Sequence, residues 1–244
     1  MPGEITLIPT PLADDLPLDP TAQRCLAGLA SAEKKPLLLV ENAKTARARF
    51  AQWGLGRDLF EQMTEFHEQN EAGLLDEVLS AVKSGQSAFL LSDGGLPGFC
   101  DPGTRLVSRA HENRLRVRCL PVANAVAAAM ALSGFVSVGG GYIFQGFPPA
   151  ANEERAAFLR RLSNSTIFLP QFLMDTPYRL GAVLEDVTQF FDERWRVLVA
   201  ADLFTPREWV IRDRASVVAS EWKARVAKDP TEKKKEFVLG LCRF

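Results

Sequence analysis

The segment Ser92–Gly103 (SDGGLPGFCDPG) has the composition best suited to ligand binding in this 244-residue chain. It follows the apolar run Ala88–Leu91, and its closely spaced glycines and prolines can continue neither a strand nor a helix. The segment is therefore predicted to be a tight loop whose backbone amides and carbonyls a ligand can approach closely. Composition alone leaves two interpretations open, a ligand-binding loop and an elaborate turn.

A second group of residues has side chains that can orient a reacting group or move a proton. Glu41 stands directly after the apolar run Leu37–Val40, and open α/β sheets bind ligands at the carboxyl ends of their strands. A capping role is the alternative for Glu41. His67, Asn70 and Glu71 stand where a helical pattern begins, so His67 either caps that helix or orients a substrate.

These segments are embedded in an alternation of short apolar runs and helical patterns, which is typical of βαβ units and a parallel sheet. Predicted strands in the first half are Ile5–Ile8, Pro36–Val40, Gln62–Phe66, Ala88–Ser92 and Arg116–Leu120. Predicted helices are Pro20–Ala32, Ala43–Trp53, Glu71–Ser84 and Gly103–Asn113, followed by an alanine-rich buried helix over Val122–Phe135.

The second half has a less regular pattern that implies a second sheet. Predicted helices are Glu153–Leu162 and Tyr178–Phe191, and predicted strands are Gln171–Met174, Arg196–Ala201, Glu208–Arg212 and Phe237–Leu241. We place the division between two domains, 1–120 and 121–244, where the fifth strand ends.

Composition excludes several classes of protein. With 47% apolar residues the chain can bury one or two cores. Because 29 basic residues balance 30 acidic ones, no net positive charge draws the chain to nucleic acid or to an anionic membrane, and any RNA contact needs a local patch. No G-x-G-x-x-G fingerprint follows the first strand, which excludes a dehydrogenase of that type.

Cysteine usage and hydropathy indicate the cytoplasm. Cys25, Cys100, Cys119 and Cys242 are far apart in the sequence and lack the spacing of zinc ligands, so no metal is expected. No secretory signal is visible at the N-terminus, and the longest apolar run falls short of the roughly 20 residues that a membrane span requires. Free thiols without an export signal are typical of a reducing cytosol.

In their order along the chain, the segments of the first half resemble motifs of the tetrapyrrole-methylase superfamily, and within it the branch of small-subunit ribosomal-RNA cytidine 2′-O-methyltransferases. LIPTPL at 7–12 is similar to the family's opening strand and turn, and ENAKT at 41–45 is similar to its Glu-Asp-x-Arg-x motif. HEQNE at 67–71 resembles its His-x-x-Asn-Glu element. SDGGLP, followed by DPG at 101–103, is similar to Ser-Asp-Ala-Gly-x-Pro followed by Asp-Pro-Gly.

The resemblance continues into the second half, where GFP at 146–148 and DTPYR at 175–179 are similar to second-domain segments of the family. It implies two α/β domains of tetrapyrrole-methylase type, with a parallel sheet in the N-terminal domain and a mixed sheet in the C-terminal domain. It further implies that S-adenosylmethionine binds in a cleft between the domains and that methyl transfer needs no metal.

Carried over position by position, the resemblance also implies a set of site residues. The cofactor contacts fall at Thr10, Pro11, Asp93, Gly94, Gly95, Pro97, Asn124, Ala125, Met174 and Ala201. The polar residues expected to face the methyl acceptor are Glu41, Lys44, His67, Asn70 and Glu71, and none of them is singled out as the general base.

Several positions depart from the family pattern. Asn42 replaces an aspartate, and Lys44 replaces an arginine, which loses a planar two-pronged donor. Val122 stands where glycine is usual, and Phe204 and Thr205 stand where threonine and lysine are usual. These departures indicate a divergent subgroup.

The resemblance favours a methyltransferase that acts on a ribose hydroxyl of ribosomal RNA, with ribosomal RNA or a ribosomal subunit as partner. The alternatives are the same fold and cofactor with a small-molecule or protein acceptor, and a non-enzymatic protein that binds a partner in its cleft. Two basic clusters are candidates for RNA contacts: Lys233–Lys235, whose other interpretation is a solvated loop, and a helical face with Arg155, Arg160 and Arg161. A homodimer is expected.

Overall fold

The computed structural model describes residues 2–13, 15–32 and 34–244. The chain separates between Ala123 and Asn124 into two compact units, each with its own sheet and apolar core. We predicted a division between residues 120 and 121.

The first unit is built on a parallel sheet with the strand order β3-β2-β4-β1-β5. Its strands are β1 (Glu4–Ile8), β2 (Leu37–Val40), β3 (Met63–Glu65), β4 (Ala88–Leu91) and β5 (Arg116–Cys119). β4 is buried along its whole length, as expected for a central strand with helices on both faces.

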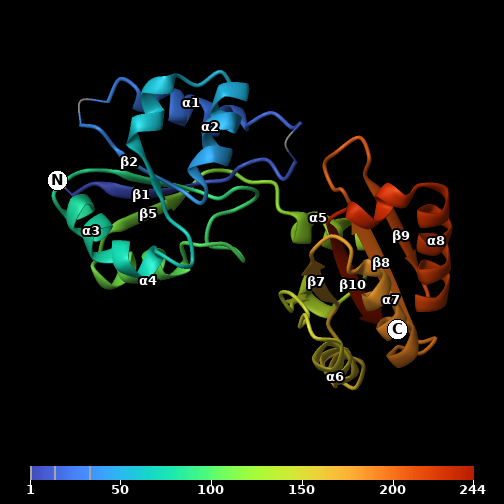
Figure 1. Ribbon diagram of the computed structural model, residues 1–244. Helices are drawn as coiled ribbons and strands as arrows, with labels where there is room; N and C mark the ends of the chain where they lie inside the picture. The colour runs from blue at the N-terminus through green and yellow to red at the C-terminus, as the bar shows by residue number, and fades with distance from the viewer. Residues whose placement is uncertain (1, 14, 33) are drawn as a thin grey trace. The chain divides into compact units, whose positions relative to one another are not determined.

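Helices cover both faces of this sheet (Figure 1). α1 (Pro20–Leu29) and α2 (Ala43–Gln52) bury their apolar side chains on one face, and α3 (Glu71–Lys83) and α4 (Thr104–Glu112) do so on the other. The chain leaves β1 towards α1 and leaves the adjacent β4 towards α4, so neighbouring strands lead to opposite faces. This arrangement is a topological switch point, the place where open α/β sheets form a ligand-binding crevice.

The second unit has a mixed sheet with the strand order β6-β7-β10-β8-β9, in which β6 and β7 are parallel and the other pairs are antiparallel. Its strands are β6 (Ile143–Phe144), β7 (Gln171–Asp175), β8 (Trp195–Ala201), β9 (Trp209–Asp213) and β10 (Phe237–Arg243). α6 (Asn152–Ser163), α7 (Leu180–Phe190) and α8 (Ala215–Lys228) form the main core with one face of this sheet. α5 (Ala125–Ser133) packs on the other face, where Phe135, just after it, contacts Phe172.

The predicted fold class is confirmed: the first sheet is parallel and the second is mixed. The predicted strands and helices are present, with ends that differ by a few residues. Three short 3-10 helices, Arg57–Gln62, Val138–Gly140 and Pro230–Lys234, were not predicted, and neither were β6 and α8. α8 carries neighbouring β-branched residues and has no side-chain hydrogen bond at its N-cap, Arg214, so two usual sequence signals of a helix are weak there.

The alanine-rich helix, which is predicted to be buried, is buried only in part. Asn124 caps α5, and Gly134, at φ +56°, ends it in the left-handed region. Val126, Ala129 and Ser133 are buried, whereas Leu132 is 48% exposed. The alanines do not distinguish a core helix from a surface helix because their side chains are too small to show an apolar stripe.

The four cysteines are free thiols. Within the described ranges, no group of three or more His, Cys, Asp or Glu residues is arranged to hold a metal ion. None of the helices in this part of the chain is both long and apolar enough to cross a membrane.

Candidate active site

The loops that follow β1 and β4 are joined by backbone hydrogen bonds at the switch point. Thr10 and Gly95 form an antiparallel bridge, in which the Thr10 amide lies 2.9 Å from the Gly95 carbonyl oxygen and the Gly95 amide 3.1 Å from the Thr10 carbonyl oxygen. The buried Thr10 hydroxyl donates to the Ser92 carbonyl oxygen at 3.1 Å. Two segments that are more than 80 residues apart in the sequence thus form one rigid edge.

Glu41, at the carboxyl end of β2, belongs to the same assembly. Its Oε2 accepts a hydrogen bond from the Asp93 amide at 3.1 Å. Neither predicted role of Glu41, acceptor contact or helix cap, includes this bond. β4 lies between β1 and β2 in the sheet. The bond from Glu41 therefore ties the loop after β4 to the end of β2, while Thr10 ties the same loop to the segment after β1.

Arg49 is the polar residue of this site that the sequence analysis missed. Its Nη1 donates to the Pro11 carbonyl oxygen at 3.3 Å and also to the Asp93 carbonyl oxygen. A signal was available, since Arg49 lies three residues after Ala46 and four before Trp53, both of which are buried, so the helical repeat turns it inward. Arg49 therefore joins the loops that carry the predicted cofactor contacts Pro11 and Asp93.

Gly94 and Gly95 differ in the room that each leaves for a side chain. Gly95 has φ +89°, and a β-carbon there would lie 3.2 Å from Leu12 Cδ2, so this position favours glycine even without a ligand. A β-carbon at Gly94 would meet the Pro11 carbonyl oxygen at 3.7 Å, an ordinary contact. Pro97 is buried beside them. Gly95 is buried and Gly94 is half-buried. A glycine loop at a switch point fits a cofactor that approaches backbone closely, as the resemblance implies for S-adenosylmethionine.

His67, Asn70 and Glu71 lie after β3, at the edge of the sheet, and form a turn of their own. The His67 amide donates to Asn70 Oδ1 at 2.8 Å, and the Asn70 and Glu71 amides donate to the His67 carbonyl oxygen at 3.0 and 2.8 Å. Glu71 is buried, and its Oε1 accepts a hydrogen bond from the Leu106 amide in the first turn of α4 at 3.3 Å. This contact gives Glu71 a structural role, while the half-buried His67 side chain stays a candidate for acceptor contact.

Lys44 and Asn42 stand at the start of α2. Asn42 Oδ1 accepts hydrogen bonds from the Lys44 and Thr45 amides, both at 3.0 Å, which is the N-cap function that an aspartate would also provide. The replacement of aspartate by Asn42 therefore preserves the cap. Lys44 is exposed in the first turn, on the same edge of the sheet as Glu41.

The predicted cofactor residues of the second unit are distributed over α5 and one end of the sheet. Met174 and Ala201 lie at the carboxyl ends of β7 and β8 and flank the start of β10 between them. Asn124 caps α5 by accepting a hydrogen bond from the Ala127 amide at 3.0 Å, and Ala125 is its first residue. Val122 is 37% exposed in the segment before this cap.

Backbone strain is found in three of the loops that carry the family motifs. Cys100, Tyr178 and Phe204 have φ of 65°, 73° and 69°. Such conformations cost about 1–3 kcal/mol each and concentrate at functional sites, where the surrounding structure maintains them. Asp202, with φ of 49°, directly follows Ala201, and Phe204 lies two residues further on.

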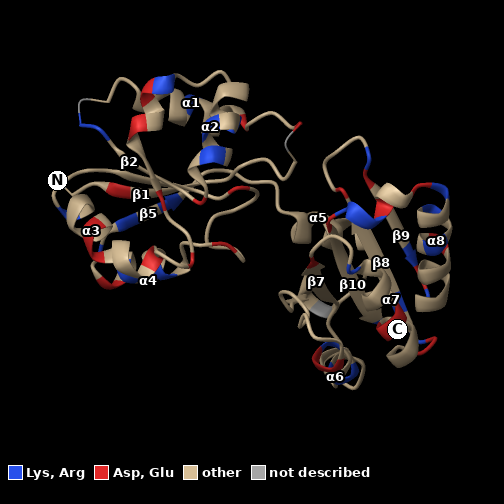
Figure 2. Ribbon diagram, viewed as in Figure 1, with Lys and Arg blue, Asp and Glu red and all other residues tan. Residues whose placement is uncertain are grey.

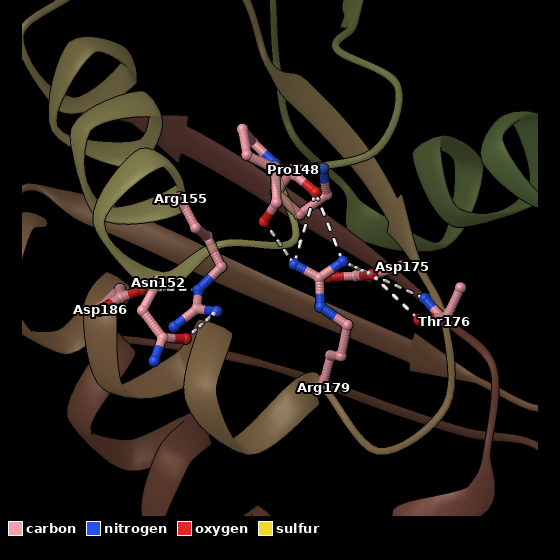
Figure 3. A network of polar contacts seen from close by, with 8 residues as sticks. Pro148, Asn152, Arg155, Asp175, Thr176, Arg179 and Asp186 are labelled. Atoms are coloured by element: carbon pink, nitrogen blue, oxygen red, sulfur yellow. Dashed lines mark hydrogen bonds and ion pairs between the residues drawn. The ribbon is translucent and has the colours of Figure 1, made fainter.

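Arg179 organises the DTPYR segment of the second unit (Figure 3). Its Nη1 lies 2.8 Å from Asp175 Oδ1, and its Nη2 donates to the Pro149 carbonyl oxygen at 2.5 Å. Burial raises the pKa of the Asp175 carboxyl, although hydrogen bonding by the Thr176 amide and the charge of Arg179 oppose that rise. Arg179 thus ties the loop after β6 to the end of β7 and the start of α7, beside Met174.

The prediction of a common basic face on α6 was wrong. Arg155 is only 5% exposed, and its Nε lies 2.7 Å from Asp186 Oδ2, whereas the exposed Arg160 and Arg161 lie over the rings of Phe190 and Phe158. α6 also carries Glu153 and Glu154 in its first turn, so acidic as well as basic segments are visible on it (Figure 2). Lys235, in the other predicted cluster, is not a solvated residue either, because its side chain is 11% exposed and its Nζ lies 3.1 Å from Glu232 Oε1.

Replacing Arg155 by methionine should destabilise the protein by about 2 kcal/mol, because Asp186 would keep its charge in a largely buried position without a partner. Chemical denaturation measures this change. Arg161→Met, on an exposed position of the same helix, is the matched control and should change stability by less than about 0.5 kcal/mol. Equal stability of the two variants would contradict the structural role of Arg155.

A family model described as Tetrapyrrole (Corrin/Porphyrin) Methylases matches residues 21–219. The chain belongs to this family. Membership confirms the predicted methyltransferase class and, with it, S-adenosylmethionine as the methyl donor.

Individual relatives extend the comparison over nearly the whole chain. The chain is 27% identical over 240 residues to "Ribosomal RNA small subunit methyltransferase I" of Neisseria meningitidis serogroup A, covering 98% of this chain and 76% of that one. The protein of the same name from Escherichia coli O157:H7 is 28% identical over 237 residues, covering 97% and 77%. Among solved structures, a diphthine synthase has a TM-score of 0.60 at 13% identity, covering 98% of this chain and 90% of that one, which supports the fold.

Proposed function

We propose that the protein transfers a methyl group from S-adenosylmethionine to a ribose 2′-hydroxyl of small-subunit ribosomal RNA. The observation that carries this proposal is the hydrogen-bonded assembly at the switch point, where the loops after β1, β2 and β4 meet through Thr10, Glu41 and Gly95. The full-length similarity to methyltransferases named for ribosomal RNA supports the choice of acceptor.

We propose that Pro11 and residues 93–95 of the first unit contact the cofactor through their backbone. The family resemblance assigns further contacts to Met174, Ala201 and the start of α5. When bound, S-adenosylmethionine supplies a methyl group on a positively charged sulfur. Arg49 and Glu41 hold the loops of the first unit in place through their bonds to Asp93. A site fixed in this way aligns the acceptor with the donor, which is the main requirement of a displacement reaction.

The acceptor side of the site comprises Glu41, Lys44 and His67. Glu41 uses one carboxylate oxygen to accept the Asp93 amide, and we propose that its negative charge orients the ribose hydroxyl. Lys44, exposed in the first turn of α2, is placed to attract the RNA phosphate backbone. Asn70 shapes the turn that presents His67.

Labelled cofactor should transfer its methyl group to small-subunit ribosomal RNA, offered either as naked RNA or within ribosomal subunits. Nuclease digestion should then recover the label as a 2′-O-methylated nucleoside. Because RNA capture relies on local charge, transfer should weaken as salt is raised. Label that appears only in a cell extract cleared of RNA would reject this acceptor in favour of a small molecule or a protein.

We further propose that the enzyme works as a homodimer in the cytoplasm, where ribosomal subunits are found. Static light scattering should return twice the monomer mass of 26.9 kDa at micromolar concentration. A result equal to the monomer mass would reject the dimer.

A further inference from the structure

A cluster of arginines and phenylalanines in the second unit has no role in the proposed methyl transfer. We call it the arginine–phenylalanine surface and define it as Phe135, Arg196, Arg212 and Phe244. Phe244 is 62% exposed, which is unusual for a side chain of this size. Exposed aromatic rings that lie together mark interaction sites more often than isolated ones do.

Strand register places the central members on one face of the sheet. Trp195, Val197 and Ile211 belong to the core beneath α6, α7 and α8, so the alternating residues Arg196 and Arg212 point to the opposite face. Arg196 pairs with Cys242 of β10, and Arg212 pairs with Leu198 of β8. The surface is therefore built on strands and is not a property of a single loop.

This surface lies at the other end of the sheet from the proposed cofactor contacts. β10 begins at Phe237, which pairs with Ala201 and Asp175, and ends at Arg243, which pairs with Trp195. A ligand on the surface would therefore be bound separately from Met174 and Ala201.

The guanidinium groups lie against the rings. The Arg212 guanidinium carbon is 5.2 Å from the Phe135 ring centroid and 5.6 Å from that of Phe244. Arg196 is 5.7 Å from the Phe244 centroid. Arg243 lies 5.9 Å from the Phe168 centroid, but it stands two residues after the core residue Leu241, which places it on the helix-covered face and outside this surface. The Arg196 Nη1 also donates to the carbonyl oxygens of Glu193 and Trp195, at 2.9 and 3.1 Å, so its guanidinium is fixed in position and its remaining edge donors can meet phosphate or carboxylate oxygens.

The positive charge of these arginines is not neutralised by ion pairs. Neither Arg196 nor Arg212 forms an ion pair with a carboxylate of the described residues, while the nearby Asp192 and Glu193 are bound by Arg194 and Arg214. The chain as a whole has a formal net charge of −1, so this is the local basic patch that RNA binding requires.

We propose that the arginine–phenylalanine surface binds a single-stranded segment of the RNA substrate. The arginines would contact phosphates, and the exposed ring of Phe244 would stack on a base, which is the usual combination in single-strand binding. This inference rests on the proposed function and extends it to a substrate region outside the acceptor site. A second copy of the chain fits less well, because a two-fold contact would bring unpaired arginines towards one another.

The test compares two double variants. Arg196→Gln with Arg212→Gln removes charge from the surface. Arg160→Gln with Arg225→Gln is the matched control, because these guanidiniums also lie over aromatic rings, 4.8 Å from the Phe190 centroid and 4.6 Å from the Trp209 centroid, on elements of the helix-covered side. The affinity for a single-stranded fragment of small-subunit ribosomal RNA is measured by fluorescence anisotropy at several salt concentrations, and the affinity for S-adenosylhomocysteine confirms folding.

The surface variant should bind RNA roughly 10-fold more weakly, and its log–log salt slope should be shallower by about 1.4, or about 0.7 for each lost phosphate contact. Phe244→Ala should weaken binding by roughly 5-fold or more with little change in slope, because it removes stacking and leaves charge in place. The control variant should stay within about 2-fold of the unmodified protein.

Three results would overturn the proposal. Unchanged RNA affinity of the surface variant, with methyl transfer to RNA intact in the unmodified protein, would reject the surface and leave the proposed function standing. Label found only in RNA-free extract would reject the proposed function itself. Conversion of a dimer into a monomer by the surface substitutions, with unchanged RNA affinity, would identify the surface as a contact between copies of the chain.

Discussion

Replacement of Gly94 by valine should weaken S-adenosylmethionine binding by roughly 100-fold, or about 2.8 kcal/mol, while the first unit stays folded. A β-carbon at Gly94 meets only an ordinary contact, with the Pro11 carbonyl oxygen at 3.7 Å, so the protein itself tolerates a side chain there. A bound cofactor would not, because the side chain would occupy the space from which the ligand approaches the loop backbone. Isothermal titration calorimetry with S-adenosylmethionine and S-adenosylhomocysteine measures the loss.

Gly95 is the less informative position for this test. Valine there would be strained at φ +89° and would press on Leu12, so lost binding could come from a distorted Thr10–Gly95 bridge. Gly73→Ala in α3 is the matched control, because its β-carbon meets no atom of the described residues within 4 Å and alanine favours a helix. Unchanged cofactor affinity in Gly94→Val would remove this loop from the cofactor site.

The loop after β4 could be predicted as a ligand-binding element because its glycines and prolines interrupt an apolar strand. Its bonds to Thr10 and Glu41 could not be predicted from the sequence, since strand order decides which loops meet. β1 and β2 are separated by nearly thirty residues and lie on either side of β4, and only the order β3-β2-β4-β1-β5 brings their carboxyl ends to the same loop. The helical repeat indicates that Arg49 turns inward, but its partners could not be predicted, because they are backbone carbonyls of distant loops.

The burial and the partners of charged side chains could not be predicted from the sequence. Arg155 and Lys235 occur in basic clusters that suggest a solvated surface, yet both side chains are buried against carboxylates. Arg196 and Arg212 have no ion-pair partner among the described residues, are sixteen residues apart in the sequence, and come together only through sheet register. A search for basic clusters along the sequence therefore does not find this pair.

The bond between Glu41 and the Asp93 amide means that two effects of Glu41 must be separated, its effect on the loop and its effect on the acceptor. Glutamine retains a side-chain oxygen that can accept the same hydrogen bond but removes the negative charge. Alanine removes both. The two substitutions therefore distinguish a residue that only positions the cofactor loop from one that also acts on the acceptor.

Glu41→Gln should lower methyl transfer to small-subunit ribosomal RNA by about 100-fold, the lower end of the range for a lost acid–base group, while S-adenosylhomocysteine affinity changes by less than about 3-fold. Glu41→Ala should lose transfer to at least the same extent and also weaken the cofactor by roughly 5-fold, since the Asp93 amide loses a charged partner. Lys44→Ala should raise the KM for RNA with little effect on kcat, and Arg47→Ala, another exposed cation of α2, serves as its control. Equal loss of cofactor affinity in both Glu41 variants would mean that Glu41 only positions the cofactor loop. Methyl transfer by Glu41→Gln at the rate of the unmodified protein would place the acceptor away from Glu41. His67 would then be the next side chain to substitute.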